Sequence, residues 1–364
     1  MNAFRCLFHA AIIGAIVSTQ VAAAQPHKTQ PYHVDWYLHP QRLMDVGGRR
    51  LNIFCIGTGS PSVILEAGLV ADAAAWRRVQ PAISRTTRVC SYDRAGLGFS
   101  DPTGAPRDAT AIVRDLHTLL RRAAIAPPYV LVGWSSGGLY TRLYQYRYPS
   151  EVTGLVEVDP DTEFDADNAN IVATVMHTSR EWYQQQVHDW YKQYDNCAIN
   201  ASRGTCAFFL GGLARYHERL RTAGCPAISP AECALAEVRG EHLNRGSLWK
   251  DEALELEASE KSSAEVRAAE RPYGNLPLIV LTDSEDGDID YSAPLIISVK
   301  AQRAMWVAKD QAEERLAALS SVGAHFVVAG STHAIQLDHP AVVISAVDEV
   351  VAQARYGVDQ GAER

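Results

Sequence analysis

A Gly-x-Ser-x-Gly pattern near the middle of the chain most constrains how it can fold. The pattern spans residues 133–137 and has Ser135 at its centre. The apolar run 129–132 before it is typical of a buried strand, and residues 139–148 after it contain neither proline nor glycine, as expected of a helix. A strand that turns directly into a helix brings two backbones close together, which glycines permit because they lack Cβ atoms. The pattern therefore predicts a sharp strand–turn–helix with Ser135 at its apex.

Short apolar runs alternate with helical stretches on both sides of this turn. Between residues 43 and 160 the runs are 63–65, 88–92, 129–132 and 154–158, with helices expected over 71–83 and 109–124. The alternation resumes with a strand at 276–281, a helix at 298–319, a strand at 325–328 and a helix at 340–355. Such alternation indicates a parallel sheet covered by helices on both faces, and residues 49–56 are expected to add an antiparallel strand at its beginning.

The alternation is interrupted between residues 161 and 271. This segment holds no convincing strand, and helices are expected over 179–193 and 247–270. We therefore expect one α/β domain made of 25–160 and 272–356, a helical cap insertion of 161–271 and a loose tail of 357–364. Aromatic side chains of the insertion are candidates to line an apolar pocket or simply to pack its helices: Trp182, Tyr183, Trp190, Tyr191, Tyr194, Phe208, Phe209 and Trp249.

The first 24 residues resemble a secretory signal peptide. Arg5 precedes an apolar stretch at 10–17, and small residues at 21–24 precede Gln25. We expect cleavage there and a secreted or periplasmic protein, since the apolar stretch is too short to span a membrane and no later segment approaches that length. Loss of Arg5 changes the net charge from −8 to −9. An acidic chain without a basic stripe is not expected to bind nucleic acid.

The six cysteines that remain after cleavage fall into two groups. Cys55 and Cys90 lie in apolar strand-like runs and are expected to be buried free thiols. The other four cluster in the insertion and are expected to form two disulfides in an oxidising compartment, with three pairings possible: Cys197, Cys206, Cys225 and Cys233.

Ser135 requires a base to become a nucleophile, and His333 has the position of one. A serine hydroxyl attacks a carbonyl carbon only when a neighbouring group removes its proton. His333 follows the last apolar run, 325–328, and so lies on a loop at the carboxyl end of a parallel strand. Ser135 also follows a strand, and open α/β sheets place their sites at this edge. The sequence therefore predicts that Ser135 and His333 meet.

Three motifs together resemble the α/β-hydrolase superfamily. They are Gly133-Trp134-Ser135-Ser136-Gly137, Gly330-Ser331-Thr332-His333 and the stretch from Tyr92 to Ser100, and the resemblance covers 43–356 apart from the insertion. It implies a mostly parallel eight-stranded sheet and a serine–acid–histidine triad, with no cofactor and no metal.

The resemblance leaves two candidates for the triad acid. The usual position follows the strand before the histidine, where Asp286 lies, and a variant of the fold places the acid after the preceding core strand, where Asp159 lies. Asp286 is favoured because it occupies the usual position. A calcium loop formed by Asp286, Asp288 and Asp290 is a weaker interpretation, because the loop glycine and the distal glutamate are absent.

An oxyanion forms when the serine attacks, and backbone N–H groups are expected to stabilise it. One is the N–H of Ser136 at the start of a helix. The other is expected from the loop after 63–65, where the pair Ala67-Gly68 resembles a His-Gly pair common in the family and makes the Leu69 N–H the candidate.

The sequence thus predicts an exported serine hydrolase that acts on a small-molecule ester or amide-type substrate. A carboxylic ester hydrolase with an acyl-enzyme on Ser135 is favoured. A peptidase, lactonase, thioesterase or acyltransferase would use the same triad and stays open. A binding protein that kept the fold without catalysis is the alternative of another class, and the complete triad argues against it.

Overall fold

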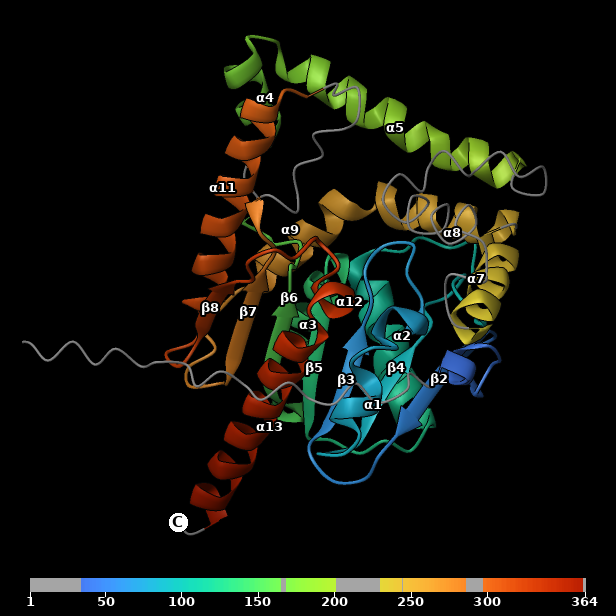
Figure 1. Ribbon diagram of the computed structural model, residues 1–364, viewed down its shortest axis with the longest axis vertical. Coiled ribbons are helices and arrows are strands. Elements are labelled where there is room, and N and C mark those ends of the chain that lie inside the picture. Colours follow the sequence, from blue (N-terminus) through green and yellow to red (C-terminus); the bar gives the residue numbers. More distant parts are fainter. Residues whose placement is uncertain (1–33, 165–167, 201–229, 244, 286–296, 363–364) are drawn as a thin grey trace, which may run out of the picture. The chain divides into compact units, whose positions relative to one another are not determined.

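An eight-stranded sheet forms the centre of the computed structural model, which describes residues 34–164, 168–200, 230–243, 245–285 and 297–362 (Figure 1). The strands are β1 Arg42–Asp45, β2 Arg50–Ile56, β3 Ser62–Glu66, β4 Val89–Tyr92, β5 Tyr129–Trp134, β6 Val152–Val158, β7 Leu278–Thr282 and β8 Ala324–Val327. Strands β3 to β7 are buried almost throughout, as expected of strands that are covered on both faces.

The spatial order of the strands is β1-β2-β4-β3-β5-β6-β7-β8. β2 runs antiparallel to both of its neighbours, and every pair from β4 to β8 is parallel. The predicted mostly parallel eight-stranded sheet is therefore confirmed, including the antiparallel strand over 49–56. Because the parallel strands share one direction, their carboxyl ends meet at one edge, where the loops after β3, β5, β6, β7 and β8 converge.

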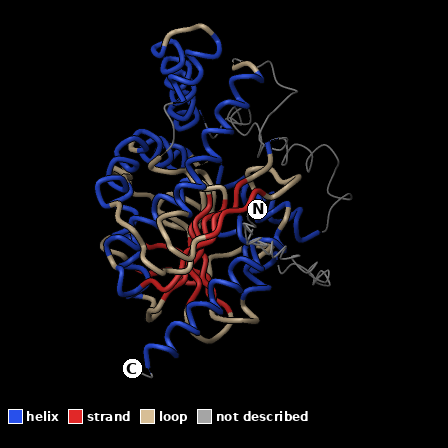
Figure 2. Tube along the Cα trace, turned by 90° about the vertical axis from the view of Figure 1, so that its left-hand side faces the viewer, coloured by secondary structure: helices blue, strands red, loops and turns tan. Residues whose placement is uncertain are grey.

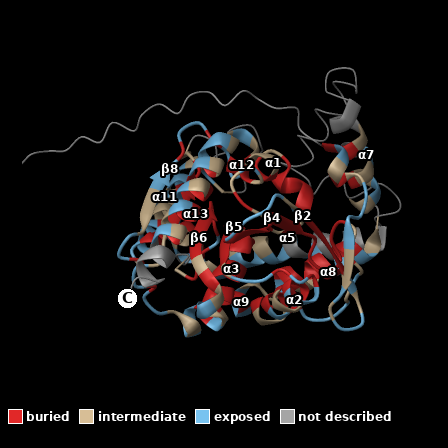
Figure 3. Cartoon of the chain, turned by 90° about the horizontal axis from the view of Figure 1, so that it is seen from below, coloured by how far each residue is buried: buried red, intermediate tan, exposed pale blue. Residues whose placement is uncertain are grey.

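Helices cover both faces of the sheet (Figure 2). One face carries α2 Ala109–Arg122, α3 Ser136–Arg147 and α9 Ser259–Ala269, whose apolar side chains form one core cluster with the strands. The other face carries the short helices η2 Ala73–Trp76 and α1 Gln80–Ile83 and the long helix α13 Pro340–Ala362. Buried residues accordingly concentrate in the strands and on the inner sides of these helices (Figure 3).

The described residues between β6 and β7 are helical and contain no strand. They form α4 Asn168–Met176, α5 Arg180–Asn200, α7 Pro230–Leu243, α8 Gly246–Glu257 and α9. α4 and α8 contact α5, whereas α9 contacts α2 and α3. Ser262 and Glu265 of α9 accept hydrogen bonds from the first backbone N–H groups of α2, at 2.9 and 2.8 Å. The last part of the insertion is thus built into the helical cover of the sheet.

Two helices differ from the sequence prediction. The helix expected over 71–83 is two short pieces, η2 and α1, because Pro81 fixes a new helix start and Asp72 caps η2 separately. The tail expected to be loose from residue 357 continues α13 as far as Ala362. No proline interrupts the sequence after residue 340, so nothing local ends the helix earlier.

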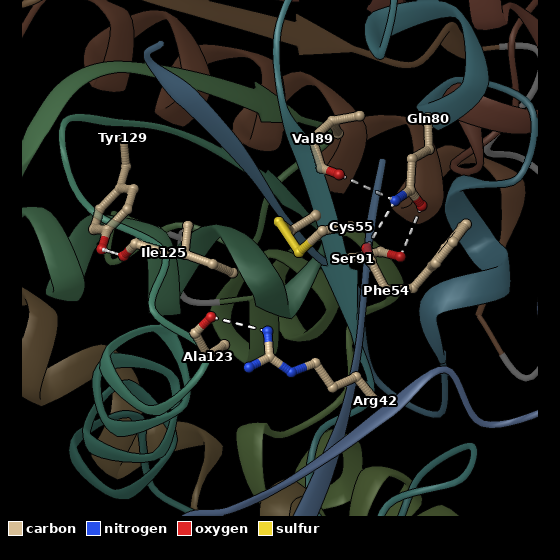
Figure 4. Close-up of a disulfide and its surroundings, with 10 residues drawn as sticks. Arg42, Phe54, Cys55, Gln80, Val89, Ser91, Ala123, Ile125 and Tyr129 are labelled. Carbon is tan, nitrogen blue, oxygen red and sulfur yellow. Dashed lines mark hydrogen bonds between the residues drawn. A yellow bond between two sulfur atoms is a disulfide. The ribbon is translucent and has the colours of Figure 1, made fainter. Parts of the chain in front are cut away.

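Cys55 and Cys90 form a disulfide, so the prediction that both are free thiols is wrong. The two residues are direct partners in the antiparallel pairing of β2 and β4, and their Cα atoms are 4.1 Å apart. Gln80 of α1 donates to the backbone carbonyls of Phe54 and Val89 on either side of the bridge, at 3.0 and 3.4 Å (Figure 4). Cys90 is buried as predicted, but Cys55 is exposed. The apolar surroundings of both cysteines gave no sign of the strand register that brings them together.

Several predictions fall outside the described residues or side chains. They concern the signal peptide over 1–24, the pairing of Cys197, Cys206, Cys225 and Cys233, and Asp286. Within the described part of the chain, no helix is both long enough and apolar enough to cross a bilayer.

Candidate active site

Ser135 lies at the turn between β5 and α3 in a strained backbone conformation. Its φ is 55° and its ψ is −127°, values that few non-glycine residues adopt. A Cβ on Gly133 would lie 2.6 Å from the hydroxyl oxygen of Thr141, and one on Gly137 would lie 2.6 Å from the carbonyl oxygen of Glu66. The two glycines are therefore required by close packing, and the predicted strand–turn–helix at Ser135 is present.

His333 lies beside this turn, on the loop between β8 and α12 Ile335–Asp338 (Figure 1). The indole N–H of Trp134 donates to the His333 carbonyl at 2.8 Å, and the two rings lie 5.4 Å apart. Trp134, the residue before Ser135, thus fixes the backbone of the loop that carries His333. In the described structure the Ser135 hydroxyl makes no hydrogen bond to the imidazole, a contact that commonly tightens only when substrate is bound.

The carboxylate that bonds to His333 Nδ1 belongs to Asp159, the alternative acid of the sequence analysis. Asp159 follows β6, has a φ of 44° and has a fully buried side chain. Asp286, which the sequence favoured, lies outside the described residues. A neutral imidazole has one N–H to donate, and its Nδ1 position is taken by Asp159. The preference for Asp286 is therefore not supported by the contact that defines a triad acid.

Burial and charge act in opposite directions on the pKa values of Asp159 and His333. Burial would raise the pKa of Asp159, but the hydrogen bond and charge of His333, followed by the charge of Lys309, lower that pKa on balance. Desolvation would lower the pKa of His333, and the hydrogen bond and charge of Asp159 raise it. We take the effect of desolvation on the histidine to be small, because 46 % of the imidazole is exposed. Asp159 therefore stays ionised and makes His333 a stronger base.

The loop after β3 carries Leu69, whose backbone N–H is the second expected oxyanion donor. A Cβ on Gly68 would lie 2.9 Å from the Ser135 Cβ, so this loop runs directly past the nucleophile and Leu69 follows at once. Ser136 is the first residue of α3, and its N–H has no partner within the helix. Leu69 and Ser136 thus lie on the two segments that flank the Ser135 side chain, as the sequence predicts.

A buried arginine bonds to residues 67–70 after β3, the segment called the oxyanion loop below because it carries the expected donor Leu69. Arg94 donates to the carbonyls of Ala67 and Gly68, at 2.5 and 2.8 Å, and pairs with Glu66 and with Glu255 of α8, at 3.0 and 2.8 Å. Burial, partly offset by Arg94, raises the pKa of Glu66 to about 7. The role of Arg94 in satisfying loop carbonyls could be read from its place in a turn, but its partner on α8 could not.

A second buried arginine supports the loop after β6. Arg142 of α3 pairs with Glu157 of β6 and with Glu163, at 3.4 and 2.9 Å, and donates to the carbonyl of Asp161 at 2.6 Å. The N–H of Asp161 in turn donates to the carbonyl of Ser135 at 2.9 Å. The sequence analysis missed this group, because an arginine in the middle of a helix carries no sign of the strand end that it will reach.

The first residue after β7 is Asp283, which bonds to Lys309 of α11 Val299–Ala317. Its side chain is fully buried, and its backbone N–H donates to Asp159 Oδ1 at 2.9 Å. The strand end at which the usual triad acid was expected thus carries Asp283, whose backbone N–H bonds to Asp159 and whose carboxylate bonds to Lys309.

Comparisons with known proteins agree with this geometry. A family model described as alpha/beta hydrolase fold matches residues 61–221. An uncharacterised protein of Schizosaccharomyces pombe is 46 % identical over 82 residues, which are 22 % of this chain and 15 % of that protein. The 2-hydroxy-6-oxo-2,4-heptadienoate hydrolase of Pseudomonas putida is 33 % identical over 119 residues, 32 % of this chain and 42 % of the enzyme. The matched segment spans less than half the length of these curated relatives.

Solved structures share the fold over most of the chain. The enol-lactonase of Burkholderia xenovorans is similar with a TM-score of 0.56 and 17 % identity, over 85 % of this chain and 100 % of that one. A thermophilic esterase of Thermogutta terrifontis is similar with a TM-score of 0.57 and 18 % identity, over 84 % and 94 %. The strand order, the turn at Ser135 and the matching family model agree, and the chain has the α/β-hydrolase fold.

Proposed function

We propose that this protein is an exported serine hydrolase of carboxylic esters that acts through an acyl-enzyme on Ser135. The observation that carries the proposal is the hydrogen bond that His333 Nδ1 donates to the buried carboxylate of Asp159, near a serine held at a φ of 55°. This combination orients a base at the edge of the sheet that also carries Ser135, as acyl transfer requires.

The reaction follows from these groups. The Ser135 oxygen attacks the ester carbonyl carbon while His333 Nε2 takes the hydroxyl proton, and Asp159 stabilises the imidazolium. The N–H groups of Ser136 and Leu69 stabilise the negative oxygen of the tetrahedral intermediate. The carbon–oxygen bond to the alcohol breaks as His333 returns the proton to it. Water, activated by His333, then releases the acid and restores Ser135.

Esters are favoured over other acyl compounds because the fold of a thermophilic esterase resembles this one. A lactone is a cyclic ester, and the fold of an enol-lactonase resembles this one. Export is supported by the Cys55–Cys90 disulfide, since such bonds persist in oxidising compartments.

The proposal is tested with Ser135→Ala and a panel of p-nitrophenyl esters of graded chain length and simple lactones. The variant is expected to lose about six orders of magnitude in kcat, while its melting temperature changes little because the substitution removes a single oxygen atom. Wild type, but not the variant, should be labelled by a fluorophosphonate. Activity above a few per cent in Ser135→Ala would exclude this serine as the nucleophile.

A further inference from the structure

Two buried carboxylates share one ammonium group behind the catalytic histidine. The side chains of Asp159 and Asp283 are fully buried, and that of Lys309 is 23 % exposed. Lys309 Nζ lies 2.7 Å from Asp283 Oδ1 and 3.3 Å from Asp159 Oδ1. The indole N–H of Trp306 also donates to Asp283 Oδ1, at 3.1 Å. Lys309 thus makes its shorter contact with the carboxylate that does not touch His333.

The charges of this group depend on the state of His333. With a neutral imidazole, two carboxylates and one ammonium leave a net charge of −1, and protonation of His333 brings the group to zero. A buried net charge is costly, so the arrangement favours the imidazolium that forms when Ser135 attacks. If Asp283 were absent, Lys309 would keep its contact with Asp159 and offset more of the charge on which His333 depends.

We propose that Asp283 and Lys309 form an ion pair that keeps the charge of Asp159 available to His333. Both are positioning residues that act through Asp159 and do not touch substrate. This inference rests on the proposed function, since it concerns the basicity of the proposed catalytic histidine. In this proposal Asp283, the residue after β7, supports a triad whose acid follows β6.

Other charged groups near His333 are left unchanged by the test. Asp161 lies on the loop after β6, and its carbonyl is bonded by Arg142 of α3. Asp338 of α12 accepts from the backbone N–H of Thr332 at 3.0 Å. Burial raises the pKa of Asp161, and the charges of His333, Asp159 and Lys309 act on that pKa as well, so the double variant serves as the control for its response.

The two single substitutions are expected to act in opposite directions. Lys309→Met removes a positive charge, which favours the imidazolium and raises the pKa of His333 by about 0.5 to 1 unit. Asp283→Asn removes a negative charge and strengthens the effect of Lys309 on Asp159. The pKa of His333 should therefore fall by a similar amount. The double variant Asp283→Asn/Lys309→Met removes both charges together and should return the pKa to within about 0.3 unit of wild type.

The experiment is an NMR titration of the protein carrying ¹³Cε1-labelled histidine, with the His333 signal assigned by its absence in His333→Gln. The same four proteins are then labelled with a fluorophosphonate across pH. The acid limb of the labelling rate should move to higher pH in Lys309→Met, to lower pH in Asp283→Asn, and back in the double variant.

Shifts of the same sign, or shifts below about 0.2 unit in both single variants, would overturn the inference, because a purely structural pair has no reason to move the histidine in opposite directions. Melting temperatures establish folding, and Lys309→Gln replaces Lys309→Met if the apolar variant does not fold. The titration requires no chemistry at Ser135. Absence of labelling in wild type would therefore count against the proposed function, and absence of opposite shifts against the ion pair.

Discussion

Three residues at the carboxyl edge of the sheet have positive φ values, which non-glycine residues rarely adopt. They are Ser135, Asp159 and Val70, with φ values of 55°, 44° and 57°. Each such conformation costs about 1 to 3 kcal/mol and persists only where surrounding contacts impose it. The N–H of Ser135 donates to Val158 and that of Asp159 to Leu281, at 3.3 and 2.6 Å. Strain of this kind gathers where a side chain must be held in one direction, which is what a nucleophile and its acid require.

The identity of the acid gives a prediction at this scale. Asp159→Asn should reduce kcat on the preferred ester by about 10⁴, because an amide stabilises the wrong histidine tautomer and carries no charge. Asp286→Asn is the matched control and should keep most of the activity. Steady-state kinetics of both variants, with melting temperatures, decide the matter. If Asp286→Asn lost most of its activity and Asp159→Asn stayed active, Asp286 in the loop after β7 would be the triad acid.

Residue types and motif order led to Ser135, His333, Leu69 and Ser136 as candidates in the sequence, because each is tied to a strand end or a turn. The choice of acid could not be made in this way. The loops after β6 and β7 leave the sheet side by side, so a carboxylate on either can reach the same imidazole. Lys309 was beyond prediction, since the face of α11 that meets the strand ends is set by tertiary packing.

At the scale of elements, α8 supports the oxyanion loop. Glu252 Oε2 accepts from the N–H of Val70 at 2.8 Å, and Glu255 pairs with Arg94, which bonds the carbonyls of Ala67 and Gly68. Val70 is β-branched, so its positive φ is especially unfavourable and requires an external partner. The geometry of the Leu69 N–H therefore depends on a helix about 180 residues further along the chain.

The dependence of the Leu69 N–H on α8 is tested by comparing Glu252→Ala with Glu252→Gln. Burial, followed by the neighbouring Glu255, raises the pKa of Glu252 to about 8, so the carboxyl is largely neutral at pH 7 and glutamine is a close mimic. Glu252→Gln should resemble wild type because its amide oxygen still accepts from Val70. Glu252→Ala should lower kcat by roughly 10-fold to 100-fold with little change in KM, since an oxyanion donor is displaced.

Equal losses in both Glu252 variants would show that the hydrogen bond to Val70 does not matter. Lys250→Ala, on the exposed side of α8, serves as a control for general effects on the helix. A matching fall in melting temperature without a fall in kcat would indicate a role in stability alone.

Elements with strong periodicity were the most predictable. The parallel strands and α2, with Ile112, Leu116 and Leu119 on one face, follow directly from the apolar pattern. The division of 71–83 into two short helices was not visible, because a cap at Asp72 and a proline at 81 compete with the same pattern. The role of α9 was hidden for another reason. Its buried residue Val266 would look the same on a cap helix as on a helix that covers the sheet.

At the scale of the whole molecule, one disulfide connects the antiparallel part of the sheet to the parallel part. Cys55 on β2 and Cys90 on β4 close a loop with a sequence separation of 35 residues. That loop contains β3 and the oxyanion loop. A cross-link of this span restricts the unfolded chain and is expected to contribute about 3 to 4 kcal/mol to the free energy of unfolding.

If the proposed export takes place, the mature protein expected to begin at Gln25 gives the corresponding prediction. Non-reducing peptide mapping should recover Cys55 joined to Cys90. Cys55→Ala/Cys90→Ala should lose about 3 to 4 kcal/mol in urea unfolding, with the usual addition for lost packing. The double variant, measured with and without reductant, also separates this bond from any among the four other cysteines. Recovery of Cys55 as a free, alkylated peptide from the exported protein would contradict the pairing.

The attachment of α8 and α9 also bears on how the chain could be re-engineered. A designer who removed 161–271 as one exchangeable module would uncover the apolar side of α2 and α3, and would remove Glu252 from the Val70 N–H and Glu255 from Arg94. A graft that ends at residue 245 would keep both supports, but it must preserve the packing of Leu235 of α7 against Tyr37 and Phe54 and the contact between α4 and α11. The boundary at which specificity could be exchanged with a relative therefore falls inside the inserted segment, about 25 residues before its apparent end.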